Sequence, residues 1–256
     1  MELTKETLTY LKRQSPNRIL AVYLSGSRLN NLADEDSDTD YYVVTEPEFD
    51  SLIFNRRKGK QNHNEIDFKQ VDLFQFVNSI YKSNPNVLEL FYKQPLYVNP
   101  MFIRMSEFLS ENKDRLLTLN PDHWRKACLG QMKHSYLNVL KQQGSTAKGL
   151  IGKDIVQFLK AYSYLSATLA GKGLGDSIDI NTETHGFASE MKSYDVVSDE
   201  ERNQVATFMK NQFEDIQKQP DLNDTDTGLF IELLDIAKQT YTILCVSELS
   251  GLKAVE

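Results

Sequence analysis

The chain has 256 residues, of which 40% are hydrophobic and 25% are charged, and 36 acidic against 29 basic residues leave a formal net charge of −7. This length is sufficient for one large or two modest domains with a substantial buried core. The excess of acidic residues argues against a protein that coats nucleic acid over a broad basic surface, although it leaves room for a local basic groove.

The N-terminus and the apolar runs predict a cytoplasmic protein with no membrane segment. Residues 1–14 are amphipathic and mixed in charge, and they lack the apolar core of a signal peptide. No run approaches the roughly 20 apolar residues that are needed to span a bilayer. Cys128 and Cys245 lie in apolar, helix-like stretches, so we expect two reduced thiols and consider a disulfide less favoured.

In chain order, the first hundred residues alternate between helix and strand patterns. Apolar residues recur at helical spacing over residues 3–13, and three β-rich runs then predict strands at residues 18–25, 39–45 and 63–71. Asp72 is a candidate N-cap for a helix over residues 73–83, which the Asn84-Pro85 pair would end.

From about residue 120 onward the pattern is almost entirely helical. Apolar stripes predict helices at residues 123–143, 153–170, 199–219 and 227–249, and Ser198 with Glu201 forms a capping box before the third of them. The sequence therefore predicts an α+β protein. A small mixed β-sheet core would occupy residues 1–118, and an all-helical domain in residues 119–256 would close a cleft over it.

Two aspartates stand where the second predicted strand begins. Asp38 and Asp40 are at positions i and i+2, so on a strand their carboxylates share one face about 6.6 Å apart. Like charges repel unless a cation lies between them, and Mg²⁺ prefers such oxygen ligands. Asp67 on the third predicted strand is the candidate third ligand of a two-metal site, with Glu65 in reserve. An isolated Asp-x-Asp pair is more often simply solvated, but here strands flank it on both sides.

A glycine–serine turn follows the first predicted strand. The backbone N–H groups of Gly26 and Ser27 and the serine hydroxyl suit a phosphate oxygen, and Arg28 adds a positive charge. An ordinary strand-to-helix turn with Ser27 as N-cap is the alternative. The aspartates downstream favour the phosphate interpretation, because the turn would hold a triphosphate that the metals bridge to the carboxylates.

These motifs resemble those of a known superfamily. Gly26-Ser27-Arg28 followed by Ser37-Asp38-Thr39-Asp40 is similar to the signature of the DNA polymerase β-like nucleotidyltransferases. The segment Asn84-Pro85-Asn86-Val87-Leu88-Glu89-Leu90 narrows the resemblance to the RNA-repair-associated predicted nucleotidyltransferases of bacteria and phages. The chain departs from that group after Arg28, where Leu29-Asn30-Asn31 replaces a small residue and a glycine.

Two further features are open to more than one interpretation. Lys153, Gln157 and Lys160 share a helix face, and the resemblance implies a cationic nucleotide contact at Lys153 and Lys160, although a solvated face is equally expected. Glu89 is expected to form a salt bridge at a helix surface, with a position in the cleft as the less favoured alternative.

The hypothesis for function is a metal-dependent nucleotidyltransferase. It would use two Mg²⁺ ions to move a nucleoside monophosphate from a nucleoside triphosphate (ATP or another) to an acceptor hydroxyl, with release of pyrophosphate. The resemblance implies an RNA or tRNA end as the acceptor. The alternative is a catalytically silent nucleotide-binding or antitoxin-like regulatory module with the same fold. The sequence does not indicate the base, the acceptor or the oligomeric state.

Overall fold

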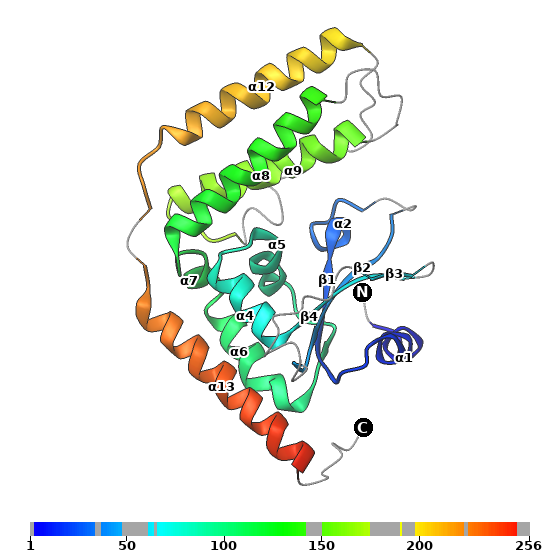
Figure 1. The fold of residues 1–256 in the computed structure, drawn as a ribbon. Coiled ribbons are helices and arrows are strands. Elements are labelled where there is room, and N and C mark those ends of the chain that lie inside the picture. Colours follow the sequence, from blue (N-terminus) through cyan, green and yellow to red (C-terminus); the bar gives the residue numbers. More distant parts are fainter. Residues whose placement is uncertain are drawn as a thin grey trace. The chain divides into compact units, whose positions relative to one another are not determined.

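The computed structural model describes residues 3–33, 37–47, 61–63, 66–141, 150–174, 190, 198–222 and 225–249. Five strands of this part form one mixed sheet in the order β3-β4-β2-β1-β5 (Figure 1). The strands are β1 (Ile19–Ser25), β2 (Asp40–Thr45), β3 (Gln61–His63), β4 (Ile66–Asp72) and β5 (Tyr97–Val98). Only β2 and β4 pair in parallel, and the other neighbours are antiparallel.

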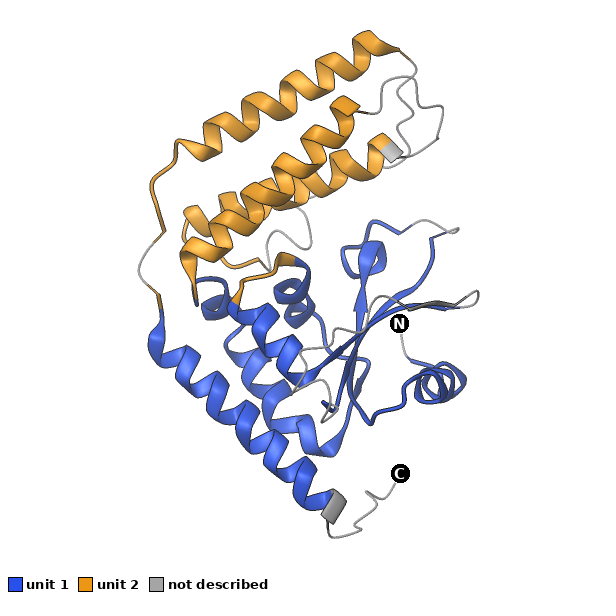
Figure 2. Ribbon diagram, in the orientation of Figure 1, with its two compact units in different colours: residues 1–81, 86–119, 226–256 blue, residues 82–85, 120–225 orange. Residues whose placement is uncertain are grey.

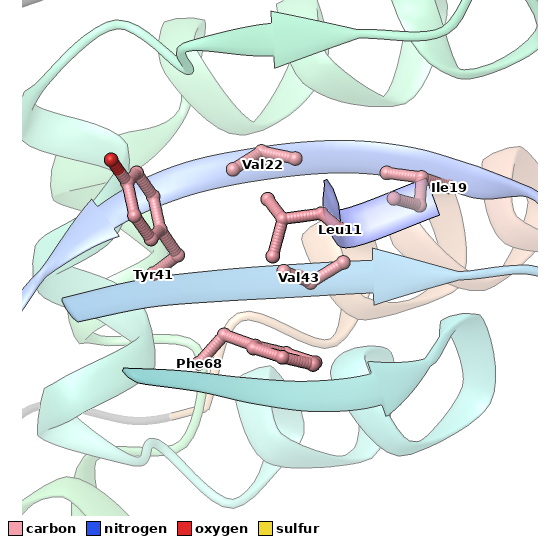
Figure 3. Packing of buried hydrophobic residues seen from close by; sticks show 6 residues of the cluster. All are labelled: Leu11, Ile19, Val22, Tyr41, Val43 and Phe68. Carbon is pink, nitrogen blue, oxygen red and sulfur yellow. The ribbon is translucent and has the colours of Figure 1, made fainter. Parts of the chain in front are cut away.

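Apolar side chains cover the two faces of the sheet in different ways. Helix α1 (Lys5–Gln14) packs Leu11 on one face, in a buried cluster that Figure 3 shows in close-up: Leu11, Ile19, Val22, Tyr41, Val43 and Phe68. On the other face, Tyr23 and Tyr42 pack against Phe76 of α4 (Leu73–Tyr81), with ring centroids 6.1 Å apart in both pairs. Because side chains alternate along a strand, each strand contributes to both faces.

The chain divides into two compact units (Figure 2). Unit 1 comprises residues 1–81, 86–119 and 226–256, and unit 2 comprises residues 82–85 and 120–225. Unit 1 holds the sheet and the helical segments α1, α2 (Gly26–Leu29), α4, α5 (Pro85–Leu88, whose first residue belongs to unit 2), η1 (Glu89–Tyr92), η2 (Pro100–Phe102), α6 (Ile103–Glu111), α7 (Lys113–Leu117) and α13 (Thr227–Leu249).

The last helix, α13, belongs to unit 1, although the sequence pattern places it in the helical domain of residues 119–256. Its Phe230 contacts Tyr81 of α4 with ring centroids 4.5 Å apart, and its Tyr241 contacts Phe74 at 5.2 Å. Asp226, just before the helix, accepts a 2.8 Å hydrogen bond from Arg115. Periodicity identifies the buried face of a helix but not its packing partner, so these contacts could not be predicted from the pattern.

The described part of unit 2 contains three long helices, α8 (Pro121–Lys141), α9 (Leu150–Leu169) and α12 (Asp199–Gln217). Fully buried Trp124 of α8 stacks on Tyr164 of α9 and donates a 3.0 Å hydrogen bond to the hydroxyl of Thr168. Arg125 of α8 donates to the backbone carbonyl oxygens of residues 217, 219 and 220 at the end of α12. Aromatic packing and these charge-assisted bonds join the three helices.

The observed elements confirm the α+β prediction and most of its details. The capping box of Ser198 and Glu201 is present, and Asp72 caps α4 by accepting a 2.8 Å bond from the Gln75 N–H. The third predicted strand begins later than expected, at Ile66, because residues 61–63 form the separate strand β3. The two-residue strand β5 was not predicted, since two residues carry no periodicity.

Two expectations about composition can also be compared with the structure. Cys128 is buried and Cys245 is half-buried, and both are free thiols as expected. Burial raises the pKa of the Cys128 thiol well above its usual range, so this cysteine is an unreactive core residue. None of the helices in the described residues is long and apolar enough to cross a bilayer.

Candidate active site

The register of the sheet brings two of the predicted aspartates together. Asp40, the first residue of β2, pairs with Ser25 on β1 and with Asp67 on β4. Directly paired residues point to the same side of a sheet, and neighbouring strands lie about 4.8 Å apart. The neighbouring pair Tyr41 and Phe68 belongs to the cluster beneath α1, so Asp40 and Asp67 lie on the opposite face.

Ser25, Asp40 and Asp67 form one row of paired residues across the sheet, and the glycine–serine turn lies directly against Asp40. Gly26 follows β1 with a φ of +69°, and a Cβ atom at this position would lie only 2.2 Å from Oδ2 of Asp40. The Asp40 carboxylate therefore rests on the bare backbone of Gly26. The short helix α2 that begins here is closed by a 2.8 Å bond from the Leu32 N–H to the Ser27 carbonyl oxygen. Only glycine fits both the backbone angle and the close approach.

Asp38 is held differently from Asp40. It is exposed and precedes β2, outside the strand ladder. The guanidinium of Arg28 donates to the backbone carbonyl oxygens of Ser37 and Asp38, the second at 3.3 Å. Arg28 thus joins the turn to the segment that carries Asp38, and its donors are directed at backbone carbonyls in this structure. Glu65, the reserve candidate, lies outside the described residues.

The donor chemistry of the row suits a magnesium ion. Mg²⁺ keeps several waters and is typically held by one or two carboxylates together with substrate phosphates. Asp40 and Asp67 offer two carboxylates on one face, and the Asp40 carboxylate lies against the backbone of Gly26. In the part of the chain that the structure describes, however, no group of three or more His, Cys, Asp or Glu residues is arranged to hold a metal ion. Asp38 is therefore not gathered with the other two.

Two tyrosines lie on the same face of the sheet as Asp40, two residues away from Ser25 and Asp40 along their strands. Tyr23 pairs with Tyr42 in the ladder, as Ser25 pairs with Asp40. Burial raises the pKa of both Tyr23 and Tyr42 well above the usual range of a phenol. Both phenols are buried against Phe76 of α4 and belong to the packing of this face.

A family comparison relates this chain to known proteins. The family model described as the RNA repair pathway DNA polymerase beta family matches residues 2–173. The chain belongs to this family. The match spans two thirds of the chain, including the Gly26 turn and both strands that carry Asp40 and Asp67, and it confirms the resemblance seen in the sequence. No curated protein matches the chain.

Membership indicates a polymerase β-like nucleotidyltransferase and hence transferase activity. It also indicates which part of the chain carries the family's features. The matched residues end at 173, after α9, so the family model includes the sheet and the helices α8 and α9 but neither α12 nor α13.

The candidate lysines of α9 lie in unit 2 and differ in environment. Lys153 is exposed. The Lys160 side chain is buried, and its Nζ lies 5.7 Å from the centroid of the Tyr164 ring. Between them, Gln157 accepts a 2.6 Å hydrogen bond from Gln131 of α8. The shared helix face is thus exposed at Lys153 and buried at Lys160.

Sequence reasoning missed one residue of the site face and was wrong about another residue. Lys69 pairs with Tyr42, two residues beyond Asp67 on the same face, and its Nζ lies 5.3 Å from the centroid of the Tyr42 ring. The alternation of the predicted strand could have identified it.

Glu89, expected at a helix surface, is 2% exposed, because the 3₁₀ turn η1 buries residues 89–91 together and its Phe91 packs on Tyr23.

Proposed function

We propose that the protein is a metal-dependent nucleotidyltransferase that moves a nucleoside monophosphate from a nucleoside triphosphate to an acceptor hydroxyl. The observation that supports this most directly is the in-register pair Asp40 and Asp67, with the Asp40 carboxylate against the backbone of Gly26. In a family of polymerase β-like nucleotidyltransferases, this is where a triphosphate and divalent ions would be expected together.

Each residue of the site has an assigned role in this proposal. Asp38, Asp40 and Asp67 would hold two Mg²⁺ ions, and the Gly26 N–H and the Ser27 hydroxyl would hold the β- and γ-phosphates. When bound, the ions neutralise charge on the triphosphate and lower the pKa of the acceptor hydroxyl. Catalysis of this kind depends on positioning and electrostatics more than on side-chain acids.

The bond changes of the reaction balance without a further co-reactant. The acceptor oxygen forms a bond to the α-phosphorus, and the bond from the α-phosphorus to the oxygen that bridges it to the β-phosphorus breaks. Pyrophosphate leaves with that electron pair. The proton of the acceptor hydroxyl passes to the carboxylate of Asp67.

We propose an RNA end as the acceptor, on the strength of the family description. The test is incubation of the protein with each of the four α-labelled ribonucleoside triphosphates, Mg²⁺ and a total RNA pool. The expected result is label transferred to RNA by the wild-type protein and none by Asp40→Asn or Asp67→Asn. Asp235→Asn, which removes an exposed carboxylate of α13 in the same unit, is the matched control and should retain transfer. Transfer by the Asp40→Asn variant would refute the mechanism.

One observation favours the alternative of a silent nucleotide-binding or regulatory module. Within the described ranges, no trio of potential metal ligands is assembled. Equilibrium binding of a triphosphate in the presence of Mg²⁺ separates the two functions. Binding that depends on Asp40, without transfer to any acceptor, would favour the module.

Of the two lysines, we propose Lys153 as a contact to a nucleic-acid phosphate, because its ammonium group is exposed. Lys160 is less suited to that role, since its side chain is buried and lies over Tyr164. A Lys153→Gln variant should bind labelled RNA more weakly and should lower the dependence of binding on salt. Lys172→Gln, another exposed lysine of unit 2, is the control and should bind as the wild type does.

A further inference from the structure

The two aspartates of the Asp-x-Asp pair are positioned by different parts of the molecule. Asp40 is fixed on both sides by the sheet, through its pairing with Ser25 and Asp67. Asp38 has no place in the ladder, since β2 begins at Asp40. A carboxylate outside the strand ladder needs another constraint if it is to bind the same cation as its neighbour.

Arg28 supplies such a constraint. Its Nη2 donates to the carbonyl oxygen of Ser37, and its Nε donates to that of Asp38 at 3.3 Å. The planar guanidinium can hold two acceptors at a fixed separation, which an ammonium group cannot do in the same way. Arg28 is itself anchored on the turn, because it lies in α2 two residues after Gly26.

The printed hydrogen bonds of Arg28 are directed at the backbone. Its Nε and Nη2 atoms both donate to carbonyl oxygens, those of Asp38 and Ser37. This arrangement suits a role in holding the segment before β2 better than a role in binding the phosphates beside Gly26.

We propose that Arg28 is a positioning residue of the transfer site, whose guanidinium holds the carbonyl oxygens of Ser37 and Asp38 and thereby keeps the segment that carries Asp38 beside the turn, from where the carboxylate joins Asp40 when a cation binds. This inference rests on the proposed function, and it assigns Arg28 a different task from the phosphate contact that the sequence suggests. It predicts that loss of Arg28 affects the metal more than the nucleotide.

The first test measures Mn²⁺ binding by the loss of the free-ion EPR signal, and metal-free binding of a triphosphate by calorimetry. Arg28→Met should weaken Mn²⁺ binding about 10- to 100-fold, the usual effect of removing a group that orients a ligand. Its metal-free affinity for triphosphate should not change. The Mn²⁺ affinity of Arg28→Lys should lie between that of the wild type and that of Arg28→Met. Arg13→Met, which removes an exposed arginine of α1, is the charge-matched control and should bind Mn²⁺ as the wild type does.

The second test does not depend on metal or activity. Amide hydrogen exchange at residues 37–39 should be faster in Arg28→Met than in the wild type and unchanged in Arg13→Met. Unchanged exchange at these amides, or a loss confined to metal-free triphosphate affinity, would overturn the proposal. If the wild-type protein bound no Mn²⁺ but exchange still increased in Arg28→Met, the proposed function would fail while the role of Arg28 in holding the segment would stand.

Discussion

Replacement of Gly26 by alanine tests the geometry of the site most directly, because one methyl group produces two separable effects. The first is on the backbone, since Gly26 has a φ of +69°. The second is on the carboxylate, since the new Cβ would lie 2.2 Å from Oδ2 of Asp40. Two non-bonded heavy atoms prefer about 3.5 Å, so the carboxylate has to move by roughly 1.3 Å.

The expected magnitude follows from these two effects. A non-glycine residue in the left-handed region costs about 1–2 kcal/mol of stability. The displaced Asp40 carboxylate leaves the row that it forms with Asp67, so Mn²⁺ binding and label transfer should be lost. We therefore expect a modest decrease in the free energy of unfolding together with a complete loss of function.

Gly171 provides a matched control for the backbone effect. It follows α9 with a φ of +70°, and no atom lies within 4 Å of the position that a Cβ would take. Its N–H bonds to the Thr168 carbonyl oxygen, and the Lys172 N–H bonds to that of Ala167, as is usual for a glycine that ends a helix. Gly171→Ala should lose a similar amount of stability and keep Mn²⁺ binding. Urea unfolding and EPR titration measure both quantities for each variant.

One outcome would refute this reasoning. If Gly26→Ala bound Mn²⁺ and transferred label as well as Gly171→Ala does, the Asp40 carboxylate would not need its position against residue 26. The proposed site would then be in the wrong place, whatever the loss of stability.

Three further predictions concern stability. Asp226→Ala should lower the free energy of unfolding by about 1 kcal/mol, because Asp226 accepts a 3.0 Å bond from the Leu229 N–H and caps α13. The bond from the Leu229 N–H, followed by the pairing with Arg115, holds the pKa of Asp226 below its usual range. The contribution of Asp226 to the free energy of unfolding is therefore full above about pH 4 and falls as the pH drops through the lowered pKa. Urea unfolding across a pH series measures this contribution. Gly130→Ala, at an exposed position within α8 with open space around it, should stabilise by up to about 1 kcal/mol and raise the melting temperature. Ser198→Ala removes the capping box of α12 and should lower the melting temperature, at a cost of about 1 kcal/mol.

Each of these has a contrary outcome. A difference between wild type and Asp226→Ala that stayed constant down to pH 2 would show that the carboxylate charge contributes nothing. A destabilised Gly130→Ala would mean that α8 needs the flexibility of glycine at that position. An unchanged melting temperature for Ser198→Ala would mean that the start of α12 does not limit the stability of unit 2.

Much of the local structure could be predicted from the sequence, and the candidate site residues were proposed from it. The β-rich runs and apolar stripes depend only on the period of side chains in strands and helices, so β1, β2, α4 and the long helices lie close to their expected positions. Capping depends on a side chain and a backbone group only a few residues apart, which is why Asp72 and Ser198 were identifiable. The aspartates and the glycine–serine turn stood out because of their charge and spacing.

The tertiary structure alone decided which of those residues meet. Asp40 and Asp67 share a row because β2 and β4 pair in parallel at one particular register, and a shift of one residue would place Asp67 on the other face. The donors of Arg28 reach backbone carbonyls nine and ten residues away, and α13 packs on α4 across more than a hundred residues of intervening chain. Such contacts depend on the path of the chain in space, whereas periodicity and spacing report only on neighbours along it.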